Sequence, residues 1–260
     1  MTMKPIVAGN WKMNKDMDEA LSFVDEVKNR ILDKDGANVI FCPPFTSLFS
    51  IARLLDSSPF YLGAQNVHHE TEGAYTGEIS VQMLNSVNVD YAILGHSERR
   101  IFFGETNEFI RKKINAVLKG GLIPIVCIGE SLDERNAGQT EEVLKKQIEN
   151  CFNNLKGINE NSLILAYEPI WAIGTGISAK EIQITQAHRY IRRIIHTMFG
   201  ENGQNIPILY GGSVNVDNAL SLIKIDGVDG FLIGGASLNL ESFCKIIELV
   251  TDNYKRGLLC

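Results

Sequence analysis

Eight short runs of apolar residues recur along the chain, and none of them alternates strictly with polar residues. Strands that are buried on both faces, as in a parallel sheet, have this continuous apolar character. The pattern predicts strands over 5–10, 38–44, 60–66, 91–96, 123–130, 163–169, 207–213 and 230–237. Between them, apolar residues recur every three or four positions, most clearly over 20–31, 144–155, 184–198 and 240–250. This spacing predicts core-facing amphipathic helices.

Strands that alternate with helices indicate an α/β protein with a parallel sheet and right-handed crossovers. Eight such units in 260 residues predict a (β/α)8 TIM barrel. A doubly wound open sheet is the alternative, because strand order is invisible in the sequence. No Ser/Pro/Gly-rich linker or change in composition divides the chain, so we expect a single domain over 1–260.

Composition excludes several classes of function. The chain has 25 Lys and Arg against 31 Asp and Glu, and this net charge of −6 argues against a nucleic-acid-binding surface. No apolar stretch approaches the roughly 20 residues of a membrane span, and the short apolar run near the start does not resemble a signal peptide. The five cysteines form no CxxC pair, which is typical of reduced thiols. We therefore expect a cytoplasmic protein.

Active sites of such barrels lie at the C-terminal ends of the strands, and several polar residues stand there. Glu168 ends the sixth apolar run, and Pro169 stiffens the exit from it. A carboxylate beside an apolar loop can act as a general base, although many strand-end carboxylates only cap helices or face solvent. His96 ends the fourth run, and Ser97, a good N-cap residue, predicts a helix start. A helix N-terminus disfavours the imidazolium, so we expect a neutral ring that donates to a carbonyl oxygen.

An anion-binding region is predicted at the same end of the barrel. Lys12 follows the first strand, at the rim, where a lysine favours contact with an anion. The glycine-rich turns at 211–213 and 234–235 follow the seventh and eighth strands. In barrels this pair of loops often binds phosphate through backbone N–H groups. Glycines can also simply close tight turns, but their position favours a phosphate site.

Four other motifs do not support their usual functions. The G-x-G-x-x-A pattern of 174–179 lies five residues beyond Pro169, whereas a dinucleotide fingerprint follows its strand directly. The H-x-E of 96–98 lacks the P-C-x-x-C of zinc deaminases. His68 and His69 are expected to point apart, which argues against a metal site. Cys127, in a buried strand, is expected to be a small hydrophobe.

The chain resembles the triosephosphate isomerase family over essentially its whole length. The motifs that carry this resemblance are AGNWKMN, LGHSERR, CIGE, AYEPIWAIGTG, YGGSV and DGFLIGGASL. The resemblance implies an aldose–ketose isomerase of glycolysis and gluconeogenesis. It interconverts dihydroxyacetone phosphate and D-glyceraldehyde 3-phosphate by proton transfer through an enediol(ate), with no metal or organic cofactor.

The resemblance also implies roles for individual residues. Glu168 stands at the position of the catalytic base and His96 at that of the neutral electrophile. In this family the two residues are a known example of a base and a histidine whose pKa values are adjusted by their surroundings. Lys12 matches the cation that holds the anionic substrate, and Asn10 matches the amide beside the developing oxyanion. Glu98 stands where the family has a carboxylate near the lysine. The remaining positions match the phosphate-binding backbone: Gly174, Ser213, Gly234 and Gly235.

Two further features are implied by the resemblance. Residues 169–179 match a mobile lid, whose closure excludes water from the site. The family's lid is a known example of loop closure over a substrate. The family is usually a homodimer in which one loop reaches the partner's active site, and here that loop is 72–78 with Thr76 at the contact. Two alternatives remain open at this point: a barrel enzyme for a larger phosphorylated sugar, and a barrel that only binds a phosphorylated ligand.

Overall fold

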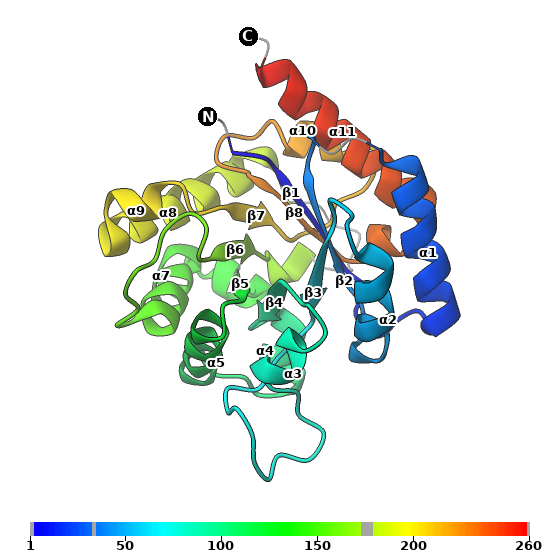
Figure 1. Ribbon diagram of the computed structural model, residues 1–260. Coiled ribbons are helices and arrows are strands. Elements are labelled where there is room, and N and C mark those ends of the chain that lie inside the picture. Colours follow the sequence, from blue (N-terminus) through cyan, green and yellow to red (C-terminus); the bar gives the residue numbers. More distant parts are fainter. Residues whose placement is uncertain (1–2, 33–34, 173–178, 259–260) are drawn as a thin grey trace.

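The eight strands close into a barrel in chain order, as Figure 1 shows. A computed structural model describes residues 3–32, 35–172 and 179–258. All neighbouring strands pair in parallel, and β1 pairs with both β2 and β8, which closes the barrel. The predicted (β/α)8 fold is thus confirmed and the open sheet is excluded. The strands are β1 (Ile6–Asn10), β2 (Asn38–Cys42), β3 (Tyr61–Ala64), β4 (Tyr91–Leu94), β5 (Ile123–Ile128), β6 (Ile164–Tyr167), β7 (Ile208–Tyr210) and β8 (Gly230–Ile233).

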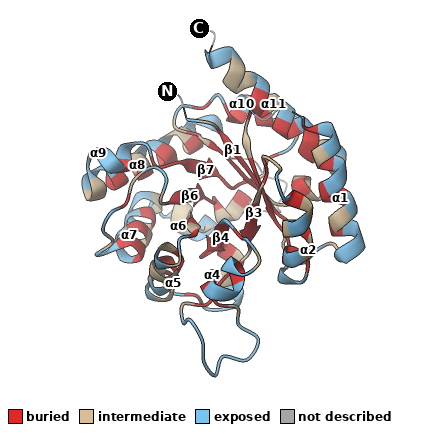
Figure 2. Ribbon diagram, viewed as in Figure 1, coloured by how far each residue is buried: buried red, intermediate tan, exposed pale blue. Residues whose placement is uncertain are grey.

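Helices form an outer layer around the barrel, with their exposed faces outward (Figure 2). The four helical segments predicted from apolar spacing correspond to α1, α7, α8 and α11, although Ile31 and Leu155 lie beyond the ends of their helices. The helices are α1 (Met17–Arg30), α2 (Phe45–Leu55), α3 (Val81–Asn85), α4 (Ser97–Phe102), α5 (Asn107–Lys119), α6 (Leu132–Asn136), α7 (Thr140–Phe152), α8 (Glu181–Phe199), α9 (Glu201–Gln204), α10 (Ala219–Leu222) and α11 (Leu240–Leu258), with short 3-10 turns η1 (Ile170–Ala172) and η2 (Gly235–Leu238).

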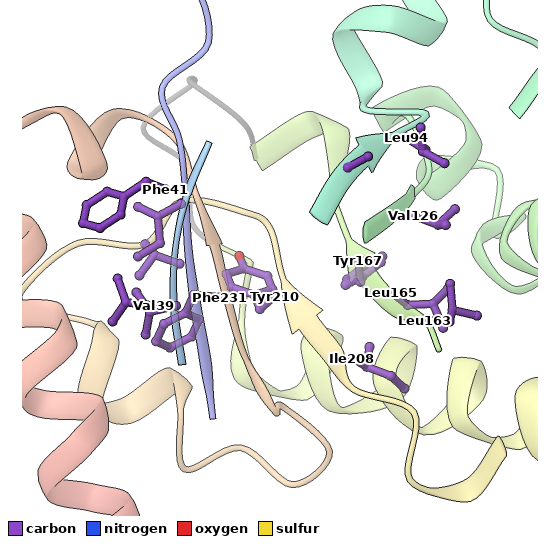
Figure 3. Close-up of a cluster of buried hydrophobic side chains, with 14 of the residues drawn as sticks. Val39, Phe41, Leu94, Val126, Leu163, Leu165, Tyr167, Ile208, Tyr210 and Phe231 are labelled. Carbon is purple, nitrogen blue, oxygen red and sulfur yellow. The ribbon is translucent and has the colours of Figure 1, made fainter. Parts of the chain in front are cut away.

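Both faces of each strand are buried, which explains the unbroken apolar runs. On β6, Leu165 and Tyr167 belong to the large cluster between strands and helices, part of which is drawn in Figure 3. Ile164 and Ala166 belong instead to a second cluster that fills the barrel interior. Because side chains alternate along a strand, the next residue, Glu168, turns inward at the mouth of the barrel.

The predicted strands extend too far at their C-terminal ends. The seventh was expected over 207–213 and the eighth over 230–237, yet β7 ends at Tyr210 and β8 at Ile233. The glycines that follow leave the sheet, and residues 235–238 form η2. The expectation of one domain over 1–260 stays a prediction.

One segment departs from the compact layers. The chain between β3 and α3 projects away from the barrel (cyan in Figure 1), and residues 70–78 within it are exposed. Thr76 lies on this projecting segment. Across the described ranges, no helix combines the length and apolar character that crossing a membrane requires.

Candidate active site

A cavity of about 220 Å³ opens at the C-terminal ends of the strands. The sequence-predicted residues that line it are Asn10, Lys12, His96, Glu168, Ser213, Gly234 and Gly235. Glu98 stands beside the cavity, paired with Lys12, whereas Thr76 lies on the projecting segment. Gly174 falls outside the described residues. The structure therefore brings a carboxylate, an imidazole, an ammonium group and glycine-rich backbone to one small hollow.

Glu168 is the most deeply buried charged group of the cavity, with 2% of its surface exposed. Its Oε1 accepts from His96 Nε2 at 3.0 Å, and its Oε2 accepts from the Ser97 backbone N–H at 3.0 Å. Burial raises the pKa of Glu168, but these two donors together with Lys12 lower it by more, so the net pKa is lowered. In this position the carboxylate is held as an anion.

Two glycines on neighbouring strand ends make room for Glu168. A Cβ atom at Gly129, after β5, would lie 1.7 Å from the Glu168 carbonyl oxygen. A Cβ atom at Gly211, after β7, would lie 2.9 Å from the Glu168 Cγ atom. The Glu168 backbone is meanwhile tied to β5, since its N–H donates to the Ile128 carbonyl at 2.7 Å. The missing side chains thus let Glu168 sit between two strands, a requirement that sequence analysis missed at Gly129.

His96 itself caps helix α4, which corrects the predicted N-cap at Ser97. The helix begins at Ser97, and the His96 Nδ1 atom accepts from the Glu98 backbone N–H at 3.2 Å. An Nδ1 atom that accepts carries no proton, so Nε2 bears the hydrogen of the neutral ring. Burial lowers the pKa of His96, but the adjacent Glu168 carboxylate outweighs it and the net pKa is raised. The cap contact favours the expected neutral ring, and the Glu168 contact opposes it.

Lys12 occupies a left-handed backbone conformation, with φ at 54°. Such a conformation is uncommon outside glycine and needs support from neighbours. The Asn10 Oδ1 atom accepts from the Lys12 N–H at 3.1 Å, and Gln65 Nε2 donates to the Lys12 carbonyl at 2.8 Å. The Lys12 Nζ atom lies 2.5 Å from Glu98 Oε1. Asn10 and Gln65 therefore fix the loop from which the ammonium group enters the cavity.

The far wall of the cavity consists of backbone after β7 and β8. A Cβ atom at Gly235 would meet nothing within 4 Å, so this peptide faces open space. The Ser213 hydroxyl donates to the Ala172 carbonyl at 2.6 Å, which joins the loop after β7 to the end of η1. Apolar side chains of Val214, Leu232 and Ala236 complete the wall. Sequence analysis missed these three because nothing distinguishes them from ordinary core residues.

Glu130 organises the start of the segment that follows Glu168. This carboxylate is wholly buried, and its Oε1 accepts from Tyr167 Oη at 3.1 Å, Trp171 Nε1 at 3.1 Å and Arg135 Nη1 at 2.9 Å. Glu130 is the last residue of the strand predicted over 123–130, and the sequence pattern indicates no role for it. A carboxylate directly after Gly129 at the end of a buried strand was the available indication.

The predicted orientation of the histidine pair is wrong. The rings of His68 and His69 do not point apart: their centroids lie 4.5 Å from each other, and His68 also stacks on Tyr75 at 4.4 Å. Within the described ranges no group of three His, Cys, Asp or Glu residues is arranged to hold a metal ion. Cys127 is fully buried in the barrel interior, as expected for a small hydrophobe.

Comparison with known proteins decides the family. The sequence model of the family described as triosephosphate isomerase matches residues 5–250. The chain belongs to the triosephosphate isomerase family. A triosephosphate isomerase from Alkaliphilus oremlandii is 47% identical over 246 residues, which cover 94% of this chain and 99% of the relative. One from Endomicrobium trichonymphae is 44% identical, with 94% and 98% covered.

A solved structure agrees with these relatives. The crystal structure of triosephosphate isomerase from Bartonella henselae superposes with a TM-score of 0.88 at 35% identity, and the match covers 95% of this chain and 99% of the other. The family and the reaction class predicted from the sequence are thereby confirmed: the chain is a triosephosphate isomerase-family enzyme, an intramolecular isomerase.

Proposed function

We propose that this chain interconverts dihydroxyacetone phosphate and D-glyceraldehyde 3-phosphate, as expected for an enzyme of glycolysis and gluconeogenesis. A proton moves between C1 and C2 of the triose through an enediol(ate). The observation that carries the proposal is the cavity of about 220 Å³ in which Glu168, His96 and Lys12 meet the glycine-rich backbone after β7 and β8. The reaction needs a base, a proton donor, a cation and a phosphate site, and these groups supply all four.

Glu168 is the base and His96 the electrophile in this proposal. Here the carboxylate accepts from the His96 Nε2–H, the donor that a substrate carbonyl requires. The substrate oxygen therefore takes the place of the carboxylate on the ring, and the carboxylate moves toward the carbon that loses its proton. Glu168 carries the proton between the two carbons, while His96 shuttles protons between the two oxygens.

Lys12 and Asn10 stabilise the charge that develops on the substrate oxygens. The left-handed backbone at Lys12 aims its ammonium group into the cavity, and Glu98 holds it at 2.5 Å until the anionic substrate arrives. Backbone N–H groups of Ser213, Gly234 and Gly235, with Gly174 of the lid, bind the phosphate. The family resemblance implies that the segment 169–179, of which 173–178 lie outside the described residues, closes over the site and excludes water, which would strengthen each of these electrostatic contacts. None of these steps calls for a metal or an organic cofactor.

The size of the cavity argues against a larger phosphorylated sugar. Pockets for drug-sized ligands occupy about 300–1,000 Å³, and about 220 Å³ fits a three-carbon phosphate more closely. A panel of phosphorylated sugars of three to six carbons would reveal a longer preferred substrate. A barrel that only binds its ligand would show no turnover in a coupled isomerase assay.

We also propose a cytoplasmic homodimer, without nucleic-acid or membrane partners. The projecting segment with Thr76 supports the dimer, because residues 70–78 are exposed and leave the body of the subunit. The exposed Phe102 and Phe103 at the end of α4 provide apolar surface for the same contact. The four cysteines of the described ranges are buried free thiols, as in a reducing compartment.

The test of the base is Glu168→Gln, which keeps the shape of the side chain. Turnover and proton exchange with solvent should fall by at least about a hundredfold, while a phosphate-bearing competitive inhibitor still binds. Glu181→Gln, at the exposed start of α8, is the matched control and should retain activity. Turnover close to wild type in Glu168→Gln would refute the assignment.

A further inference from the structure

Lys15 makes a set of contacts that the proposed chemistry does not use. Its Nζ atom donates to the Leu238 carbonyl at 3.0 Å. The same ammonium group lies 4.2 Å from the centroid of the Phe23 ring and 5.6 Å from that of Trp11. A carbonyl dipole and aromatic faces both attract a cation. Three partners thus hold this partly buried side chain in one position.

The two ends of this contact belong to segments that line the active-site cavity. Leu238 is the last residue of η2, and η2 begins at Gly235, whose peptide faces the cavity. Lys15 stands three positions after Lys12 in the segment that joins β1 to α1. The Lys15–Leu238 hydrogen bond therefore connects the loop that carries the substrate-binding ammonium to the turn that carries the phosphate-binding backbone.

Both connected segments are otherwise held near their other ends. The Ser237 hydroxyl donates to the Gly234 carbonyl at 2.7 Å, which fixes the start of the turn. Asn10 and Gln65 fix the Lys12 backbone, as described above. Lys15 has a left-handed backbone, with φ at 69°, and so the segment turns sharply at this residue before α1. Burial lowers the pKa of Lys15, and Glu19 partly offsets this.

We propose that Lys15 is a positioning residue for the phosphate end of the site. It acts by fixing the spacing between Lys12 and the peptides of Gly234 and Gly235, and not by touching substrate. The two segments lie next to each other, since a Cβ atom at Gly234 would lie 3.5 Å from the Lys12 Cε atom, an ordinary van der Waals distance. Binding of a phosphate between two loops requires that both loops keep their positions. This inference rests on the proposed isomerase function.

The test is Lys15→Met, which keeps the length of the side chain but removes the donor. We expect KM for the triose phosphate to rise about tenfold, below the roughly hundredfold that a misplacement of 1 Å can cause. The inhibition constant of inorganic phosphate should rise in parallel. Lys15→Arg, which retains a donor and a cation, should recover most of the loss. Slow turnover of D-glyceraldehyde, which has no phosphate, should stay unchanged.

Lys28→Met is the matched control. Lys28, in the last turn of α1, also donates to a leucine carbonyl, that of Leu54 in α2. This contact joins two helices of the outer layer, and neither residue lines the cavity. Its loss should lower stability without changing KM. Equal rises of KM in Lys15→Met and Lys28→Met would overturn the inference, because they would report general loosening of the barrel.

The remaining outcomes separate this inference from the proposed function. A wild-type chain without isomerase activity would overturn both. An active wild type with an unchanged KM in Lys15→Met would overturn the positioning role alone, as would an equal loss of D-glyceraldehyde turnover. Should Lys15→Met fail to fold, Lys15→Gln supplies the same measurement, since its amide is too short to take the place of the ammonium group.

Discussion

The buried His188 should make stability depend on pH between about 4 and 6.5. This residue of α8 has no exposed surface, and its Nδ1 atom lies 2.8 Å from the Gly227 carbonyl oxygen. Because a carbonyl only accepts, Nδ1 bears the proton, and Nε2 has no hydrogen-bond partner among the described residues. Burial lowers the pKa of His188 to about 4; the Gly227 contact opposes this shift and Arg192 adds to it.

The size and sign of the effect follow from proton binding. An unfolded chain binds a proton at this histidine below about pH 6.5, whereas the folded chain binds it only below about 4. Between these values the unfolded state holds more protons, so the free energy of unfolding falls as the pH falls. At about 1.4 kcal/mol per pKa unit, the full loss is about 3 kcal/mol, complete near pH 4 and absent above pH 6.5.

The assay compares urea unfolding of the wild type with that of His188→Gln at fixed protein concentration, from pH 7.5 to 4.5. The glutamine amide can donate to Gly227 but does not titrate, so on acidification the wild type should lose about 2–3 kcal/mol more than the variant. The exposed His196, on the same helix, supplies the control variant His196→Gln, whose urea unfolding is measured over the same pH range. Parallel curves for the wild type and His188→Gln would refute the reasoning.

Two further substitutions test other contacts. Gly211→Ala places a methyl group 2.9 Å from the Glu168 Cγ atom; kcat should fall about tenfold or more as the base is displaced, and an unchanged kcat would contradict this account. Lys113→Met removes the ammonium group that lies 2.5 Å from the buried Glu105; because Arg99 still pairs with Glu105 at 2.6 Å, urea unfolding should show a loss of about 1–3 kcal/mol. Lys112→Met, at the exposed neighbouring position, should change stability by less than about 0.5 kcal/mol, and equal losses would contradict the role of the buried pair.

The barrel was predictable because each strand is buried on both faces and therefore appears in the sequence as a continuous apolar run. Ile164 to Tyr167 are apolar without interruption since alternate residues face the interior cluster and the helix layer. Closure was not visible in the same way, because strand order depends on packing between segments far apart in the chain. The C-terminal ends of the strands were also hard to predict. Glycines and small residues continue the apolar runs over 211–213 and 234–237, yet these residues lie outside the sheet.

The site was predictable in its residue types but not in its contacts. Polar groups at strand ends indicated Lys12, His96 and Glu168, because such ends converge in a barrel. No pattern indicated that His96 caps α4 through its ring, since helix caps are expected from Ser, Thr, Asp and Asn. The need for glycine at position 129 depends on a carbonyl 39 positions away in sequence, and only the folded chain reveals it.

In the mechanism proposed above, the contact between Glu168 and His96 links the preparation of the base to that of the electrophile. Where it lies, the carboxylate is stabilised by two donors, and its pKa is lowered although burial acts in the opposite direction. If the Glu168 carboxylate moves away from these donors but stays buried, burial alone acts on its pKa, which then rises. The carboxylate would thus bind a proton more strongly at the position where it takes one from the substrate. The same movement frees the His96 Nε2–H for the substrate carbonyl. It also removes the charge that raises the pKa of the ring, which leaves the neutral form favoured by the Nδ1 contact. In the proposed mechanism, one displacement would therefore activate both groups.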